Sequence, residues 1–194
     1  VDTKGSHADL TDAYGAIPTE MKDVAHYFGK EFLREVDEKE FFDHLADVRA
    51  AVKNDREILR AIHFFKENAR VPQIVEALNN DNFDLFKKLI KESGNSSYKF
   101  LQNVYADFDY KHQAVSAGLA LSEIVLGDHG VSRVHGGGFA GTIQAFVEDD
   151  YVETYKTEIE KYFGEGSCHV LKVRKFGGMS GFPKRNESHF DAFD

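Results

Sequence analysis

Residues 131–147 read VSRVHGGGFAGTIQAFV, and this stretch decides the fold. A short β-branched run at 131–134 precedes the glycines, and an alternating run at 142–147 follows them. Both runs are typical of strands, because β-branched residues and a period of two fit a pleated, half-buried surface. The stretch therefore predicts two strands joined by a glycine-rich turn.

Three of these glycines, Gly136, Gly138 and Gly141, match the G-x-G-x-x-G pattern of dinucleotide-binding sites. That pattern requires a helix directly after the glycines, so that the helix N-terminus meets the pyrophosphate. Here a strand pattern follows, which disfavours a dinucleotide site. Two interpretations stay open. The glycines can serve a tight turn in which elements pack closely, or their backbone N–H groups can form an anion-binding concavity.

The sequence after the turn predicts a helix and one more strand. Asp149 or Asp150 can begin a helix that runs to Phe163, and the acidic run there favours the positive end of the helix dipole. Residues 168–173 alternate again and predict a strand. The order of strand, turn, strand, helix and strand indicates an α+β fold with an antiparallel sheet.

The first two-thirds of the chain predict helices, because apolar residues recur there every three or four positions. The expected ranges are about 17–28, 38–52, 54–78, 83–94 and 109–125. Pro18 fits the first turn of the first helix. Asn54 is expected to cap the third helix, and Pro72 to kink or split it. Gly94 is expected to end the fourth helix.

Composition excludes several classes of protein. The chain has 24 Lys and Arg against 33 Asp and Glu, a net charge of −9. Neutralising phosphates requires clustered Lys and Arg, so we expect neither a nucleic acid nor a membrane surface as a partner. No stretch approaches 18 apolar residues and the N-terminus lacks a signal pattern, so the cytoplasm is the expected compartment. The single Cys168 cannot form an internal disulfide and is expected to be reduced and packed.

The first residues resemble the end of a strand rather than the start of a protein. Residues 1–4 read as the end of a strand, and the chain as far as Tyr14 reads as strand end and loop. We therefore expect the chain to begin inside a longer protein.

Four stretches resemble conserved motifs of the GHMP small-molecule kinases, and of the galactokinases most closely. Residues 133–141 (RVHGGGFAG) and the strand after them resemble the third conserved motif of that family. Residues 6–10 (SHADL) with Tyr14 resemble the segment that leads to the conserved tyrosine of galactokinases. Residues 67–71 (ENARV) resemble the family's EN-x-R helix, and residues 91–97 (KESGNSS) its ESH-x-S turn. Taken in chain order, these motifs follow the order of the family's motifs, and the resemblance spans residues 1 to about 178, so the chain resembles the C-terminal half of a galactokinase.

This resemblance implies a fold and an activity. The fold would be α+β, a helical subdomain joined to a small antiparallel sheet with helices, as in the ferredoxin-like C-terminal domain of GHMP kinases. Residues 1–194 would form one such domain of a longer chain. The full-length protein would phosphorylate galactose to galactose 1-phosphate with ATP and Mg²⁺, both bound mainly by the N-terminal half. The expected partners are galactose and that N-terminal half, and the fragment alone is expected to be inactive.

The resemblance also implies the site residues. Tyr14 would contact the sugar, where the alternative is an ordinary half-buried aromatic at a helix entrance. The cleft near the phosphate would be lined by the glycine motif, namely Gly136, Gly137, Gly138, Phe139 and Gly141. No catalytic residue and no metal ligand is expected in this half. His135 stands where Thr is usual, and Ala140, where Gly is usual, demands a negative φ or tolerated strain.

Two other functions stay open, another GHMP kinase acting on a different sugar or alcohol, and a non-catalytic paralogue that binds galactose and ATP and regulates a partner. A zinc site is not expected, because the candidate pairs lack a second His at helical spacing and a Cys partner. These pairs are His7–Asp9, His44–Asp47 and His189–Asp191. Cys168 is not expected to act as a nucleophile with His169, since neighbours on a strand point to opposite faces.

Overall fold

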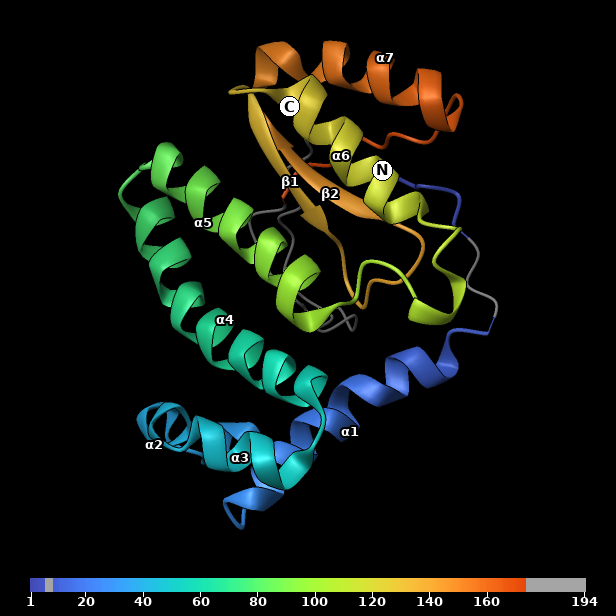
Figure 1. Cartoon of the computed structure of the whole chain (residues 1–194). Coiled ribbons are helices and arrows are strands. Elements are labelled where there is room, and N and C mark those ends of the chain that lie inside the picture. The colour runs from blue at the N-terminus through green and yellow to red at the C-terminus, as the bar shows by residue number, and fades with distance from the viewer. Residues whose placement is uncertain (6–8, 174–194) are drawn as a thin grey trace, which may run out of the picture.

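The computed structural model describes residues 1–5 and 9–173, and it confirms the α+β fold with an antiparallel sheet. Figure 1 shows helices α1 to α5 leading to a two-stranded sheet that is followed by the last helix. The elements are α1 (Thr11–Tyr27), η1 (Leu33–Glu35), α2 (Glu38–Asp43), α3 (Leu45–Val52), α4 (Asp55–Asn79), α5 (Phe83–Ser96), the π-helical η2 (Ser97–Leu101), η3 (Asp107–Asp109), α6 (Ala114–Leu126), β1 (Gly130–Val134), β2 (Ile143–Val147), η4 (Asp149–Tyr151) and α7 (Val152–Phe163).

The sheet is the antiparallel pair that the glycine turn predicts. Val131 lies opposite Phe146, and Val134 lies opposite Ile143. Because side chains alternate along a strand, these two pairs face opposite sides of the sheet. The first pair packs against Phe86 of α5, and the second packs against Val115 of α6. The sheet is therefore covered by helices on both faces.

The N-terminal residues extend this sheet, as the strand-end prediction requires. Asp2 forms an isolated antiparallel bridge with Thr142, and the Ile143 N–H donates to the Val1 carbonyl at 3.0 Å. Thr3 is buried and its backbone N–H donates to the Gly141 carbonyl at 2.7 Å. The start of the described chain is thus tied to the end of the glycine turn.

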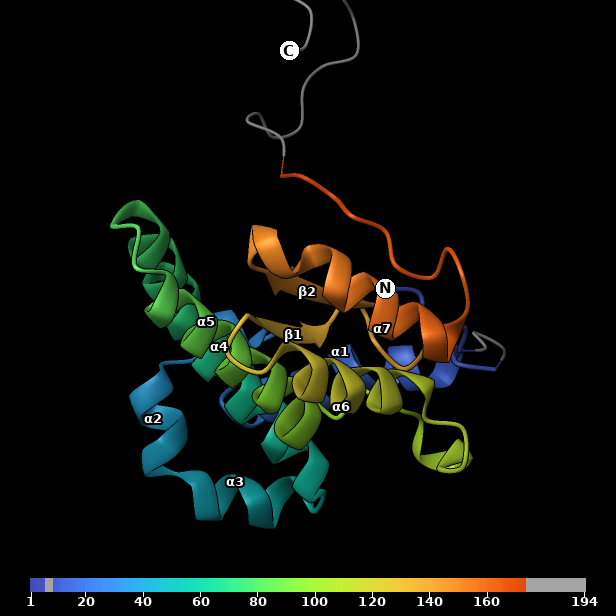
Figure 2. The ribbon, with the colours of Figure 1, turned by 90° about the horizontal axis from the view of Figure 1, so that it is seen from above.

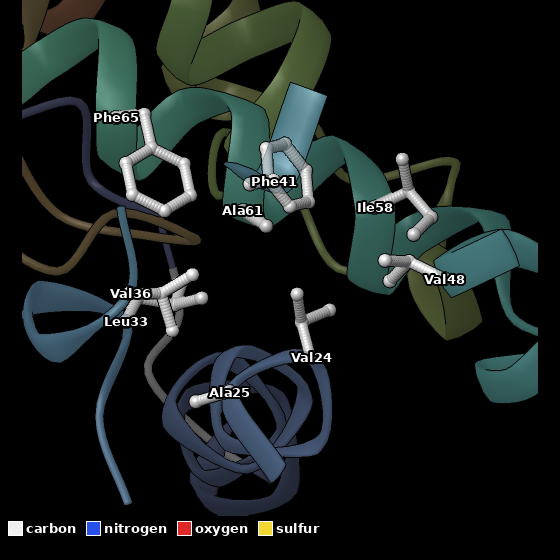
Figure 3. Close-up of a cluster of buried hydrophobic side chains, with 9 residues drawn as sticks. All are labelled: Val24, Ala25, Leu33, Val36, Phe41, Val48, Ile58, Ala61 and Phe65. Carbon is white, nitrogen blue, oxygen red and sulfur yellow. The ribbon is translucent and has the colours of Figure 1, made fainter. Parts of the chain in front are cut away.

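A second core lies away from the sheet, among α1 to α4. Figure 3 shows its buried apolar side chains, and Figures 1 and 2 show α2 and α3 far from the two strands. Phe41, Val24 and Val48 have no exposed surface, and Phe41 stacks obliquely on Phe65 with ring centroids 5.0 Å apart. The apolar residues that recur at helical spacing in the sequence therefore do form a buried core.

Two boundaries in the helical part differ from the prediction, and one predicted cap is confirmed. The helix expected over 38–52 is two helices, separated at His44, whose φ of −106° and ψ of 16° are not helical. The first helix begins at Thr11, so that Pro18 lies inside α1 and not in its first turn. Asn54 caps α4 as predicted, by accepting a hydrogen bond from the Arg56 N–H.

Pro72 does not split α4, which runs unbroken from Asp55 to Asn79. The first half of the helix packs into the core through Phe65, and the second half packs against α5 through Ala77. Packing on both sides of the proline offsets the backbone hydrogen bond that the proline cannot make.

Gly94 does not end the fourth helix, because α5 continues to Ser96. A Cβ at Gly94 would lie 3.1 Å from the Arg133 Cβ and 3.3 Å from the Ser132 carbonyl oxygen. The glycine therefore lets α5 pack closely against β1.

The strand predicted over residues 168–173 is wrong, because this segment has no regular secondary structure. Ser167 and Cys168 at its start are buried, whereas Leu171 is 86% exposed and Val173 is 95% exposed. The helix predicted after Asp149 or Asp150 is present as η4 and α7. None of the helices in the described ranges is both long and apolar enough to cross a membrane.

Candidate functional site

The glycine turn between β1 and β2 has a backbone that side chains rarely allow. Gly136, Gly138 and Gly141 have φ values of 65°, 82° and 94°. Phe139 has a φ of 60°, and the Ala140 N–H donates to the Gly138 carbonyl at 2.7 Å. This hydrogen bond across one residue is the pattern of a γ-turn centred on Phe139. A bulky residue at positive φ is strained, and such strain concentrates at functional sites.

Ala140, where the resemblance leads us to expect Gly, is accommodated without backbone strain at that residue. Ala140 is absent from the residues with positive φ in the described part of the chain, and the positive φ falls on Phe139. The methyl group of Ala140 is buried beside Leu10 and Ala106. The alanine therefore contributes apolar contact under the turn.

Asn103 holds the turn in place through two hydrogen bonds, and the sequence analysis did not identify this residue. Its backbone carbonyl accepts the Phe139 N–H at 2.5 Å, and its side-chain Nδ2 donates to the Gly137 carbonyl at 3.2 Å. A Cβ at Gly138 would lie 1.9 Å from the Asn103 carbonyl oxygen, so only glycine fits there. Asn103 is 2% exposed. No local sequence signal could have identified it, because the left-handed conformation of the preceding Gln102 is a feature of the folded backbone.

Tyr14 closes the turn from the side of α1. Its hydroxyl donates to the Gly138 carbonyl at 2.8 Å, and its ring meets the Phe139 ring edge-on with centroids 5.2 Å apart. A Cβ at Gly137 would lie 2.8 Å from the Tyr14 Cε1. The structure thus brings Tyr14 and the glycine motif together, although 124 residues separate the donor from the acceptor.

The top of the turn remains open. His135, Gly136 and Gly137 are exposed, and a Cβ at Gly136 would meet nothing within 4 Å. Among the described residues, the backbone N–H groups of Gly136, Gly137 and Gly138 form no hydrogen bond. The His135 Nδ1 lies 2.7 Å from the Gln144 Oε1, which holds the imidazole beside β2. Free amides in a glycine-rich turn are donors available to an anionic oxygen.

The two other motifs meet behind the turn, around the carboxylate of Glu67. It accepts hydrogen bonds from the Ser93 hydroxyl and from Arg70, and it lies 3.7 Å from the Nη1 of Arg133 on β1. Nearby, the buried His63 has its Nδ1 2.9 Å from the Ser96 Oγ. Residues of the EN-x-R stretch, of the KESGNSS stretch and of the RVHGGGFAG stretch therefore form one polar network. This network connects α4 and α5 to the strand that enters the turn.

Other candidate sites do not assemble. In residues 1–5 and 9–173, no group of three or more His, Cys, Asp or Glu could hold a metal ion. The His44 Nδ1 lies 2.9 Å from the Glu40 carbonyl oxygen of α2, the helix that ends just before it. His7 and the His189–Asp191 pair lie outside the described residues, as do Ser6 and Ala8 of the SHADL stretch. Cys168 is buried, and burial raises the pKa of its thiol, which disfavours the reactive thiolate.

A solved structure shares the fold of this chain. The structure of the chain is similar to that of Lactococcus lactis galactokinase, solved in complex with galactose. The TM-score is 0.66 at 21% identity, over 84% of this chain and 40% of that one. This likeness fits the α+β fold of the GHMP kinase C-terminal domain.

Sequence comparison then specifies the relatives. The chain is 29% identical over 153 residues to a galactokinase of Actinobacillus pleuropneumoniae, which covers 79% of this chain and 38% of the relative. It is 27% identical over 163 residues to a galactokinase of Glaesserella parasuis, with 84% and 40% covered. It is 29% identical over 156 residues to a galactokinase of Haemophilus influenzae. No family model matches the chain.

These comparisons confirm the resemblance to the C-terminal half of a galactokinase. The chain spans about two-fifths of the length of the curated relatives that it matches, 38–40%.

Proposed function

We propose that this chain is the C-terminal domain of a galactokinase and that the full-length protein phosphorylates galactose with ATP. The similarity to curated galactokinases over 79–84% of the chain carries this proposal. The galactose named with the solved structural neighbour supports the choice of sugar. ATP, Mg²⁺ and the catalytic groups would be held mainly by the N-terminal half, and the protein would act in the cytoplasm.

The role of this chain is to form one wall of the cleft. The hydroxyl of Tyr14 donates its hydrogen bond to the Gly138 carbonyl. The hydroxyl oxygen can therefore still accept a hydrogen bond from a sugar hydroxyl. Gly136 and Gly137 are exposed, and their backbone N–H groups form no hydrogen bond among the described residues, so these groups can donate to a phosphoryl oxygen. The clamp by Asn103 keeps these groups in place before the ligand arrives, which lowers the cost of binding.

ATP and Mg²⁺ fit this chain only in part. The amides of the glycine turn suit a phosphoryl oxygen, whereas Mg²⁺ prefers carboxylate and phosphate oxygens. The residues described supply no carboxylate cluster for it. As the resemblance implies, the metal ligands are expected from the N-terminal half, and phosphoryl transfer would be catalysed mainly by positioning and charge stabilisation there.

The test uses the full-length protein that contains these 194 residues. Galactose, other hexoses and small alcohols are offered with MgATP, and the phosphorylated products are quantified. We expect galactose 1-phosphate as the main product, and none from residues 1–194 alone. Preference for another acceptor would indicate a different GHMP kinase. Binding of galactose and ATP without turnover would indicate a non-catalytic paralogue.

A further inference from the structure

His135 lies directly after β1, where the chain enters the glycine turn. Its backbone N–H donates to the Thr142 carbonyl at 3.1 Å, which continues the ladder between β1 and β2 by one residue. Because side chains alternate along a strand, His135 lies on the same face of the sheet as Arg133 and its partner Gln144. His135 is exposed. Its backbone is therefore fixed in the sheet while its imidazole stays accessible beside the turn.

The hydrogen bond to Gln144 determines which nitrogen of the imidazole is free. The His135 Nδ1 lies 2.7 Å from the Gln144 Oε1. Because an amide oxygen can only accept, Nδ1 carries a hydrogen and donates it. The Nε2 has no hydrogen-bond partner among the residues that the structure describes. In the neutral ring Nε2 is therefore a lone pair, and in the protonated ring it is a free N–H that can donate to an anionic oxygen.

The charge of a protonated His135 is not neutralised by a neighbouring acid. Three other exposed histidines each contact a carboxylate, namely His26 with Glu31 at 3.6 Å, His112 with Asp109 at 2.7 Å and His129 with Glu148 at 3.0 Å. His135 contacts the neutral Gln144 instead. The carboxylate on this side of the sheet is that of Glu67, which Arg70 and Arg133 already share. A positive charge on His135 is thus left for an external anion.

The turn beside His135 has free donors, while two of its acceptors are occupied. The Gly137 carbonyl accepts from the Asn103 side chain, and the Gly138 carbonyl accepts from the Tyr14 hydroxyl. The backbone N–H groups of Gly136 and Gly137 form no hydrogen bond among the described residues. Such a set of groups favours a ligand that accepts hydrogen bonds and carries negative charge.

We propose that His135 binds a phosphoryl group at this turn, and that it does so only in its protonated form. The Nε2–H would donate to one phosphoryl oxygen, and the amides of Gly136 and Gly137 would donate to the others. This inference rests on the proposed kinase function, to which it adds a phosphate-binding side chain and a pH-dependent affinity. An imidazole loses its proton between about pH 5 and 8, so the affinity falls as the pH rises through this range.

The test measures the KM for MgATP of the full-length protein at pH 6 and pH 8. Wild type is compared with His135→Gln, which loses the charge, and with His135→Lys, which keeps a positive charge at both pH values. Phosphate groups also titrate near about pH 6, so the informative quantity is the ratio of variant to wild type at each pH. We expect His135→Gln to raise KM about fivefold at pH 6 and little at pH 8, the effect of one exposed, charge-assisted hydrogen bond.

Two further results separate binding of charge from a structural role. His135→Lys should keep KM close to that of wild type at pH 6 and lower it relative to wild type at pH 8, where the histidine has lost its proton. The control His112→Gln removes an imidazole that is 82% exposed and lies outside the turn, and it should leave KM unchanged. A ratio of KM between His135→Gln and wild type that is the same at pH 6 and pH 8 would overturn the inference.

Inhibition by galactose 1-phosphate distinguishes the two sources of the phosphoryl group. If inhibition weakens in His135→Gln together with the rise in KM for MgATP, His135 binds the group that is transferred. If only KM changes, it binds a phosphate that stays on the nucleotide. Turnover of galactose with a ratio independent of pH would sink the inference and leave the proposed function standing. If galactose is not phosphorylated, calorimetric titration with ATP at the two pH values makes the same comparison, so the two proposals fail separately.

Discussion

The helical core and the glycine turn are held together by different physics. The core around Phe41 consists of apolar side chains in close contact, with few polar atoms among them. The turn is held by hydrogen bonds from Asn103 and Tyr14 and by glycines that admit them at close range. Apolar contact contributes free energy in proportion to the area buried and tolerates some repacking. Hydrogen bonds contribute less free energy per group, but together with the positive φ angles they specify the geometry of the turn.

Because of this difference, we expect the helical core to determine stability and the glycine turn to determine the geometry of the candidate site. We expect changes in the helical core to lower the free energy of unfolding and to leave the shape of the turn unchanged. Changes in the turn or in the polar network behind it should cost less stability per residue and disturb the candidate site directly.

The largest expected effect is that of Phe41→Ala in the helical core. Phe41 has no exposed surface and contacts both Phe42 and Phe65. Removing the ring leaves a cavity, and the free energy of unfolding should fall by about 3–5 kcal/mol. Urea unfolding followed by circular dichroism measures this loss. The control Phe83→Ala removes a 59% exposed ring and should change stability by no more than about 0.5 kcal/mol. Similar losses in both variants would contradict the assignment of the core.

Gly138→Ala tests the turn itself. The added methyl would collide with the Asn103 carbonyl oxygen at 1.9 Å, at a φ of 82°. The positive φ and the overlap together should cost about 2–4 kcal/mol. The control Gly136→Ala has a similar φ of 65° but open space around it, so about 1 kcal/mol is expected. Urea unfolding of both variants isolates the clash. If the two costs were equal, Asn103 would not be the clamp.

Glu67→Gln tests the network that supports the turn from behind. The change removes the charge that faces Arg70 and Arg133 while it keeps a group that can bond Ser93. Leaving two partly buried guanidinium groups without this carboxylate should cost about 1–3 kcal/mol. Amide hydrogen exchange should also rise in the glycine turn. The control Glu38→Gln breaks an exposed pair with Lys66 and should cost under about 0.5 kcal/mol, with exchange in the turn unchanged. Exchange in the turn that rises equally in both variants would argue against a connection.

The smallest expected effect is a dependence on pH that originates at His63. Burial lowers the pKa of His63 below its usual 6.5, and Arg133 and Arg70 lower it further against the opposing effect of Glu67. The unfolded chain therefore binds more protons than the folded chain below that value. The free energy of unfolding should fall as the pH drops from about 6.5 through the lowered pKa of the folded state.

The measurement for His63 is a series of urea unfolding curves at falling pH. His63→Gln removes the titrating group and should flatten this part of the profile. His169→Gln changes an exposed histidine and should leave the slope as it is. An unchanged slope in His63→Gln would assign the acid sensitivity to other groups.

Most elements could be predicted because their signals are local. The strands on either side of the glycines, the cap at Asn54 and the helix after Asp149 follow from patterns within a few residues of each element. The failures share another cause. Pro72 and Gly94 are helix breakers by local rules, yet packing on α5 and the close approach to Arg133 keep both inside helices. The alternation at 168–173 predicted a strand. In the described chain this segment pairs with no strand, and its apolar side chains Leu171 and Val173 are exposed.

The sequence identified the glycine motif and Tyr14 as candidate site residues, but it did not identify Asn103, which holds the turn in place. The glycine motif and Tyr14 were identified from the sequence, and the structure brings them into contact. Their proposed contacts with sugar and phosphate stay predictions. Asn103 carries no motif, since its contribution is a carbonyl group and a short amide that reach the turn only after the chain has folded.

The sequence by itself determined the α+β class, the turn and the resemblance to galactokinases, because periodicity and glycine spacing act over a few residues. Tertiary structure alone decided that Phe139, a residue with a side chain, takes the positive φ beside Ala140. It also decided that Glu67 and Arg133 meet, and that Arg60 is buried in an ion pair with Glu20. These outcomes depend on contacts between residues far apart in the chain. The free energy of such contacts cannot be predicted from a local sequence pattern.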